Sequence, residues 1–262
     1  MTKSWKPVLL VLFTLVPLVH GKPKVLDILN GDGERNIEPP RDVASSDYFG
    51  RMRNALANDE DKWVLKDSEG NTIIPYTFGR YDDTLKDVIR EAMKRIEKNT
   101  CIRFKRRTDE ADYIHFKNVE GEGCHSKIGR FPGENVVVLE HSFTSTCMEP
   151  HLVQHELFHV IGLWHEQARR DRDDYITVNY NNVKDGQNHQ FNKVKVGLST
   201  TFDIPYDYRS LMHYGPSAFA KPGTIAIETK DKSYQSVIGT ATDASPSDYR
   251  KVCLMYKCAK CM

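Results

Sequence analysis

Two histidines and a glutamate stand at a spacing typical of a metal site. The segment is His155-Glu156-Leu157-Phe158-His159, and residues four apart are neighbours on one face of a helix. Their ring nitrogens could then bind one Zn²⁺. Gly162 can adopt the positive φ that ends a helix and turns the chain, so that His165 returns as a third nitrogen ligand. Three imidazoles leave a fourth position open for water, as in a catalytic zinc site.

Glu156 is suited to be the general base of such a site. It follows His155 directly, so its carboxylate would project beside the metal and not onto it. Zinc lowers the pKa of a bound water from about 15.7 toward 7. The carboxylate could take the proton of this zinc-activated water and pass it to the leaving amine. The alternative is a surface helix with solvated side chains, which the three histidines and Gly162 together disfavour.

The residues after the third histidine extend the pattern. Glu166 follows at once, and Arg169 and Tyr175 come soon after it, while Ser210-Leu211-Met212-His213-Tyr214 stands further along the chain. The signature His-Glu-x-x-His-x-x-Gly-x-x-His is that of the metzincins, and with these flanking residues it resembles the astacin family of zinc endopeptidases. The resemblance runs from about Asn54 to Cys258, and Ser210–Tyr214 is similar to the family's Met-turn.

The resemblance implies one zinc ion per subunit and roles for three more residues. Met212 would form an apolar floor beneath the metal. Tyr214 would be a mobile fifth ligand that swings away and donates its phenolic hydrogen to the oxyanion of the transition state. Glu166 would pair with the new α-amino group of the processed chain, which would neutralise its charge only after processing. Without the resemblance, Glu166 would be taken for a solvated carboxylate.

Hydrophobic patterns predict the elements that must position these residues. Pro150 suits the first turn of the helix that holds both histidines. A second amphipathic helix is expected from Asp82 or Asp83 to about Asn99, because its apolar residues recur every three and four positions. Short β-prone runs stand at Ile73–Phe78, Cys101–Phe104, Tyr113–Phe116 and Val136–Leu139. Pro75 would be tolerated on an edge strand.

These elements predict an α+β fold. The first half would hold a sheet and two long helices, whereas the part after Asp171 is rich in loop-forming residues and would be held by cross-links. The resemblance implies a metzincin-like catalytic domain with two lobes and the active-site cleft between them. The N-terminal lobe would contain a mixed sheet, and the C-terminal lobe would be loop-rich.

The first 53 residues are interpreted as segments that processing removes. Lys3 and Lys6 precede an apolar run from Val8 to Val19, which predicts a secretory signal peptide over residues 1–21. Residues 22–53 are polar and aperiodic, and we interpret them as a pro-segment that an activating protease would cut at about Arg53. The alternatives are a buried N-terminal helix and an ordinary linker. The catalytic domain would then span residues 54–262 and would be secreted to the extracellular space.

The pro-segment departs from the family pattern. Astacin-like pro-segments carry a Phe-x-Gly-Asp motif whose aspartate caps the zinc, but here Phe49-Gly50 is followed by Arg51. Leu29-Asn30-Gly31-Asp32 has the same form with a different hydrophobic residue. We hypothesise that Asp32 holds the zinc in the zymogen, and a Gly-Asp turn without a ligand role is the alternative. The segment Ile238–Asp243 lacks the arginine of members that cleave before acidic residues, so a strong acidic preference is not expected.

Composition limits the partners. Lys and Arg number 37 against 36 Asp and Glu, and a net charge of +1 provides no basic footprint for nucleic acid. No stretch after the predicted signal peptide is apolar enough to enter a membrane. We expect a monomer that acts on protein or peptide substrates and binds neither nucleic acid nor membrane.

The six cysteines are expected to form three disulfides in a secreted protein. The sequence alone permits about 15 pairings. The resemblance implies Cys124 with Cys147 and Cys101 with Cys258, which leaves Cys253 and Cys261 to close a small terminal loop. Cys258 and Cys261 also have the spacing of a redox motif, although a βαβ context is lacking.

The sequence therefore predicts a secreted zinc metalloendopeptidase, made as a zymogen, that cleaves internal bonds of extracellular proteins bound as extended segments along an edge strand. One alternative is another metzincin branch, which Glu166 and the Met-turn disfavour. The other is a secreted binding or toxin-like protein that keeps the scaffold without turnover. The presence of Glu156, Tyr214 and all three histidines disfavours it.

Overall fold

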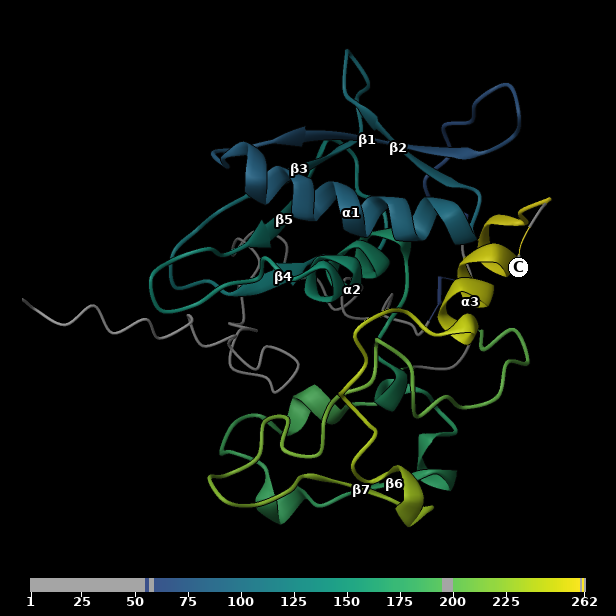
Figure 1. The fold of residues 1–262 in the computed structure, drawn as a ribbon. Helices are drawn as coiled ribbons and strands as arrows, with labels where there is room; N and C mark the ends of the chain where they lie inside the picture. Colours follow the sequence, from purple (N-terminus) through teal and green to yellow (C-terminus); the bar gives the residue numbers. More distant parts are fainter. Residues whose placement is uncertain (1–54, 57–58, 195–199, 260, 262) are drawn as a thin grey trace, which may run out of the picture.

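A mixed five-stranded sheet forms the upper half of the molecule in Figure 1. The computed structural model describes residues 55–56, 59–194, 200–259 and 261. The strands are β1 (Thr72–Phe78), β2 (Ile102–Arg106), β3 (Tyr113–Lys117), β4 (Cys124–Ser126) and β5 (Glu134–Leu139), in the spatial order β2-β1-β3-β5-β4. Neighbours are parallel except for β4, which runs antiparallel to β5 and forms one edge. The expected strands are all present, and β4 is an addition.

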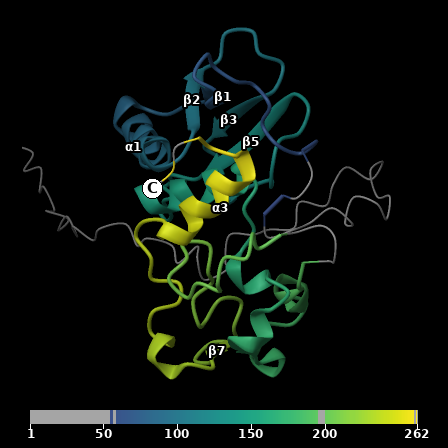
Figure 2. The same ribbon diagram turned by 90° about the vertical axis from the view of Figure 1, so that its right-hand side faces the viewer.

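Two helices pack against each other on one face of this sheet (Figure 2). The first, α1 (Asp83–Asn99), has the expected bounds, because the Asp82 carboxylate accepts a hydrogen bond from the Leu85 N–H at 2.9 Å and caps it. The second, α2 (Pro150–Ile161), starts at the predicted proline. Every residue from Leu152 to Ile161 is buried, so α2 is a central helix of the core.

Pro75 does not lie on an edge strand, so that expectation was wrong. β1 has β2 on one side and β3 on the other. The Thr72 N–H donates to the Cys101 carbonyl on the β2 side, at 2.8 Å. Because successive residues of a strand face opposite neighbours, the nitrogen of Pro75 faces the β3 side. Pairing with β3 begins only at Tyr76, so no ladder hydrogen bond is lost at the proline.

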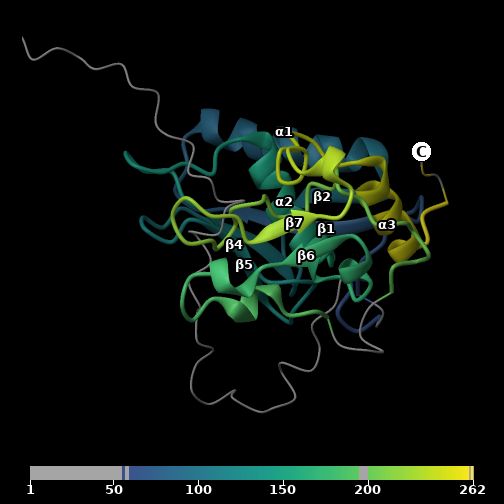
Figure 3. The same ribbon diagram turned by 90° about the horizontal axis from the view of Figure 1, so that it is seen from below.

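The second lobe is loop-rich, as expected, and lies below the first (Figure 1). It contains the antiparallel pair β6 (Ile176–Val178) and β7 (Ile227–Thr229), which stands in front of the upper sheet when seen from below (Figure 3). Short 3-10 helices lie at Glu166–Ala168, Arg172–Asp174, Tyr180–Asn182, Asn188–Phe191 and Lys232–Tyr234.

The expected cross-links of the part after Asp171 lie near its C-terminal end, in the disulfides Cys101–Cys258 and Cys253–Cys261. The chain has no cysteine between Cys147 and Cys253. Instead the lobe has its own hydrophobic cluster, whose larger members are aromatic: Phe191, Tyr206, Tyr214 and Phe219. Burial of these rings, together with the aliphatic residues of the cluster, therefore contributes to the stability of this lobe.

The final helix, α3 (Pro246–Tyr256), returns the chain to the first lobe (Figure 2). Ser245 and Asp248 form a reciprocal capping box at its start. Near its end the Tyr256 hydroxyl donates to the Ile161 carbonyl of α2 at 2.8 Å. The disulfides Cys101–Cys258 and Cys124–Cys147 are the pairs that the resemblance implies, and Cys253–Cys261 is the pair that remained. No helix among the described residues is both long enough and apolar enough to span a bilayer.

Candidate active site

The end of α2 brings the third histidine back to the first two. Gly162 has a φ of +123°, and its N–H donates to the carbonyls of Phe158 and His159 at 3.0 and 2.9 Å. A side chain is strained at this φ, and an added Cβ would lie 2.7 Å from the Leu56 Cδ1, so the Leu56 side chain would have to shift. The chain then reverses, and His165 faces the helix it has just left.

The three imidazoles converge on one point. The Nε2 atom of His165 lies 3.2 Å from the Nε2 of His155 and 3.2 Å from the Nε2 of His159. Two nitrogens bound at about 2.0–2.1 Å to one tetrahedral Zn²⁺ are about 3.3 Å apart. The spacing of these atoms therefore fits a single zinc ion.

Hydrogen bonds behind the rings point the correct nitrogens inward. The Nδ1–H of His155 donates to the Leu211 carbonyl at 3.0 Å, and that of His159 to the Leu163 carbonyl at 2.7 Å. Because a carbonyl can only accept, the proton lies on Nδ1 and the lone pair on Nε2. Burial lowers the pKa of His155 to about 3 and that of His159 to about 4, so both rings are neutral near pH 7. Neutral imidazole is the form that binds zinc.

Glu156 is buried beside its histidine and is held by a residue from the sheet. The Ser126 hydroxyl, at the end of β4, lies 2.8 Å from the Glu156 Oε2 and 3.0 Å from the Glu156 carbonyl oxygen. Ser126 was not identified from the sequence, because nothing in its spacing relates it to a residue 30 positions away.

Met212 and Tyr214 are both buried near the third histidine. The Met212 carbonyl accepts a hydrogen bond from the Glu166 N–H at 2.8 Å, which ties the Met-turn to the segment after His165. The Tyr214 ring lies with its centroid 4.3 Å from that of His165. Its backbone N–H donates to the Gln167 side chain at 3.1 Å, another contact that the sequence did not indicate.

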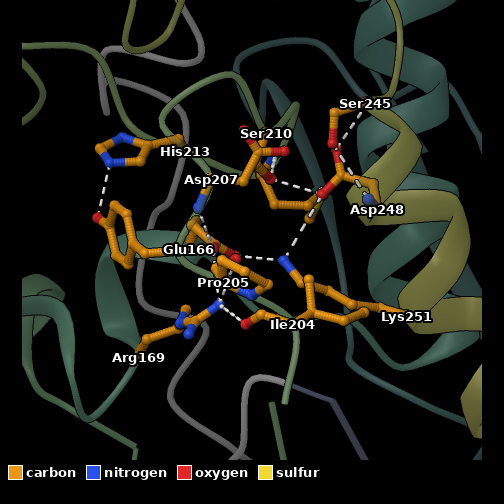
Figure 4. Close-up of polar contacts among 12 residues, drawn as sticks. Glu166, Arg169, Ile204, Pro205, Asp207, Ser210, His213, Ser245, Asp248 and Lys251 are labelled. Carbon is orange, nitrogen blue, oxygen red and sulfur yellow. Dashed lines mark hydrogen bonds and ion pairs between the residues drawn. The ribbon is translucent and has the colours of Figure 1, made fainter. Parts of the chain in front are cut away.

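Glu166 forms ion pairs with Arg169 and Lys251 (Figure 4). Its Oε1 accepts hydrogen bonds from Arg169 at 3.1 Å and from the Asp207 N–H at 3.0 Å. Its Oε2 lies 2.5 Å from the Nζ of Lys251, on α3. The resemblance implied that the charge of Glu166 is neutralised only after processing, whereas in the structure it is already paired. Lys251 was not singled out from the sequence.

Other expectations concern residues outside the described part of the chain. Asp32, the cleavage point at about Arg53 and the segments 1–21 and 22–53 all lie there.

Comparisons with known proteins agree with the geometry. The family model described as Astacin, a peptidase family, matches residues 57–257. Zinc metalloproteinase nas-5 of Caenorhabditis elegans is 44% identical, over 98% of this chain and 75% of its own length. The human meprin A subunit beta is 34% identical over 80% of this chain, which corresponds to 28% of that protein. The solved structure of high choriolytic enzyme 1, a hatching enzyme zinc-protease from Oryzias latipes, superposes with a TM-score of 0.71 at 33% identity, covering 78% of this chain and 100% of the other.

Proposed function

The chain belongs to the astacin family of zinc metalloendopeptidases, and from this membership we propose that it cleaves internal peptide bonds of extracellular proteins with Glu156 as the general base. The observation that carries the proposal is the convergence of three Nε2 atoms at zinc spacing, directly beside a buried glutamate. We assign one zinc ion to His155, His159 and His165. Zinc, when bound, supplies a Lewis acid that polarises the substrate carbonyl and lowers the pKa of a water molecule.

The protein's own groups handle the proton and the developing charge. The Glu156 carboxylate accepts the proton of the attacking water and delivers it to the leaving amine. Ser126 orients that carboxylate through the hydrogen bond to Oε2. The Tyr214 hydroxyl donates to the oxyanion, a contact that is stronger in the transition state than in the ground state. The position of Tyr214 beside the His165 ring supports this role, and Met212 packs in the core that underlies the ligands.

The edge of the sheet is the proposed binding surface for substrate. β4 pairs only with β5 among the described strands, so its other side can add an extended peptide as a further strand. Its last residue, Ser126, contacts the proposed base. A substrate along β4 would therefore run past Glu156, which supports cleavage within a chain and not only at its end.

We further propose that the protein is made as a secreted zymogen and acts as a monomer. Residues 1–21 would direct secretion, and residues 22–53 would keep the enzyme latent until a protease cuts at about Arg53. Asp32 would hold the zinc in the precursor. The variant Asp32→Ala should then be active before processing, and a variant precursor as latent as the wild type would remove Asp32 from this role.

The proposal is tested by incubating the processed protein with gelatin, with and without a zinc chelator. Glu156→Ala should lower the cleavage rate by about 10²–10⁴-fold, because the proton acceptor is lost. Zinc content, measured by atomic absorption, should be unchanged, since Glu156 is not one of the proposed ligands. Equal digestion by wild type and Glu156→Ala, or digestion unaffected by the chelator, would refute the mechanism.

A further inference from the structure

A lysine ammonium, that of Lys251, lies buried between the buried carboxylates of Glu166 and Asp248 (Figure 4). The Lys251 Nζ is 2.5 Å from the Glu166 Oε2 and 3.9 Å from the Asp248 Oδ1. The exposed fractions of the three side chains are 4%, 0% and 0%. Burying an ion is costly, and removing one partner of a buried pair is strongly destabilising because the other charge is left uncompensated. The arrangement therefore depends on the ammonium.

Asp248 connects this ammonium to the first zinc-ligand candidate. Its Oδ1 accepts a hydrogen bond from the Ser210 hydroxyl at 2.6 Å, and its Oδ2 accepts one from the Leu211 N–H at 2.9 Å. The carbonyl of Leu211 is the group that accepts from the Nδ1–H of His155. A displaced Asp248 would thus shift the peptide that sets the orientation of the His155 ring.

Glu166 connects the same ammonium to the third zinc-ligand candidate. It is the residue directly after His165, and its N–H donates to the Met212 carbonyl at 2.8 Å. Its carboxylate also accepts from the Asp207 N–H, which belongs to the loop that leads into the Met-turn. Lys251 therefore joins the segment after His165 to α3. The same helix contacts the Met-turn through Asp248.

Lys251 supplies one of the two positive charges that contact Glu166. Glu166 and Asp248 contribute two negative charges, and Arg169 and Lys251 contribute two positive ones. Arg169 is shared with the half-exposed Asp171, at 2.7 Å. Without Lys251, two fully buried carboxylates would depend on one shared guanidinium.

We propose that Lys251 is a positioning residue for the zinc site, and that it supplies from within the catalytic domain the ammonium that the resemblance assigns to the new α-amino group at Glu166. The proposal rests on the zinc ligation proposed above. Two consequences follow: zinc affinity depends on the charge of Lys251, and activity does not depend on a free N-terminus at the site.

The first consequence is tested with Lys251→Met, which keeps the aliphatic volume and removes the charge. Zinc affinity, measured by competition with a chromogenic chelator, should fall about 10–100-fold, as for other groups that orient metal ligands. On a quenched fluorescent peptide, kcat should fall while KM stays within about twofold, because no group on the substrate surface has changed. Arg250→Met, which removes an exposed charge from the same helix, is the matched control and should behave as wild type.

A double variant distinguishes the loss of the Lys251 charge from a general loss of folding. Lys251→Met with Glu166→Gln removes both charges of the closest pair, so it should bind zinc more tightly than Lys251→Met alone. If Lys251→Met does not fold, by circular dichroism, the double variant should still fold. Wild-type zinc affinity in Lys251→Met, or a double variant no better than the single one, would overturn the proposal.

The second consequence is tested with processed enzymes that carry zero, two or four extra residues before the natural mature N-terminus, found by N-terminal sequencing. Their kcat/KM values should agree within about twofold. A loss of tenfold or more in the extended forms would show that the α-amino group is required at Glu166 and would overturn this part. Because zinc binding is measured without substrate, the result for Lys251 is decided even if the Glu156→Ala test refutes the proposed mechanism.

Discussion

Individual hydrogen bonds decide which atoms of the site face one another. The Nδ1–H groups of His155 and His159 are both satisfied by backbone carbonyls, so their Nε2 atoms are left for a metal. Glu156 is held by the Ser126 hydroxyl in the same manner. The sequence identified these side chains as candidates, and these contacts set their orientation.

Ser126→Ala should lower kcat by about tenfold with KM nearly unchanged. The hydroxyl donates to a buried carboxylate at 2.8 Å, and a hydrogen bond to a charged group contributes about 1.5–3 kcal/mol. Steady-state kinetics on a quenched peptide measures the effect. Ser142→Ala is the control, because Ser142 donates to the Glu140 carboxylate at the same 2.8 Å in the loop after β5. If both variants lose kcat equally, Ser126 has no special relation to catalysis.

Two helices, α2 and α3, position the three histidines and the residues that support them. α2 supplies two histidines, and its end at Gly162 sends the chain back with the third. α3 lies far along the chain but supplies Asp248 and Lys251 to the Met-turn and to Glu166. The geometry of the site therefore depends on where α2 ends and on how α3 packs against the Met-turn and Glu166.

Gly162→Ala should destabilise the protein by about 2–4 kcal/mol and weaken zinc binding. A side chain is strained at a φ of +123°, and its Cβ would clash with Leu56 at 2.7 Å. Gly133→Ala is the matched control, because Gly133 has a φ of +85° but nothing within 4 Å of an added Cβ. It should cost only about 1 kcal/mol. Chemical denaturation measures both, and equal losses would mean that the crowding at Gly162 does not matter.

At the scale of the whole molecule, the two lobes are built in different ways. The first has a sheet and helices around one large cluster, and the disulfide Cys101–Cys258 joins its β2 end to the chain after α3. The second relies on its aromatic cluster. The histidine cluster belongs to the interior of the folded protein, so its protonation is linked to unfolding.

Metal-free protein should lose stability as the pH falls from about 6.5. Burial lowers the pKa of His155 to about 3 and that of His159 to about 4, from an ordinary 6.5. Below about pH 6.5 the unfolded chain therefore binds protons that the folded chain does not, which favours unfolding. Between about pH 6.5 and 5 the two residues together should cost about 3 kcal/mol.

Urea denaturation of the chelator-treated protein between about pH 6.5 and 5 measures how steeply the free energy of unfolding falls with pH. A variant with His155→Gln and His159→Gln should show a clearly smaller loss of stability with falling pH. The buried His165 and His213, whose pKa values burial also lowers, should keep the remainder, and replacement of the exposed His189 by Gln should leave the loss unchanged. A slope unchanged by the double replacement would mean that other groups cause the acid sensitivity.

Local chemistry in the sequence was enough to bring together the three histidines and Glu156 as a candidate site, and to predict most of the first lobe. The spacing of His155, Glu156 and His159 fixes their relation on one helix turn, and Gly162 lies only three residues further. The periodicity of α1 and the carboxylate of Asp82 set that helix in the same local way. These relations hold within a single helix or helix end, so they can be predicted without knowledge of the rest of the fold.

Contacts between distant segments were decided only by the tertiary structure. Ser126 meets Glu156 because β4 packs on α2, and Lys251 meets Glu166 across a separation of 85 residues. The interior place of Pro75 and the aromatic core of the second lobe also depend on which strands and rings become neighbours. Residue types and spacing specify what a side chain can do, but burial and partners, which set its charge and orientation, arise only when the chain packs.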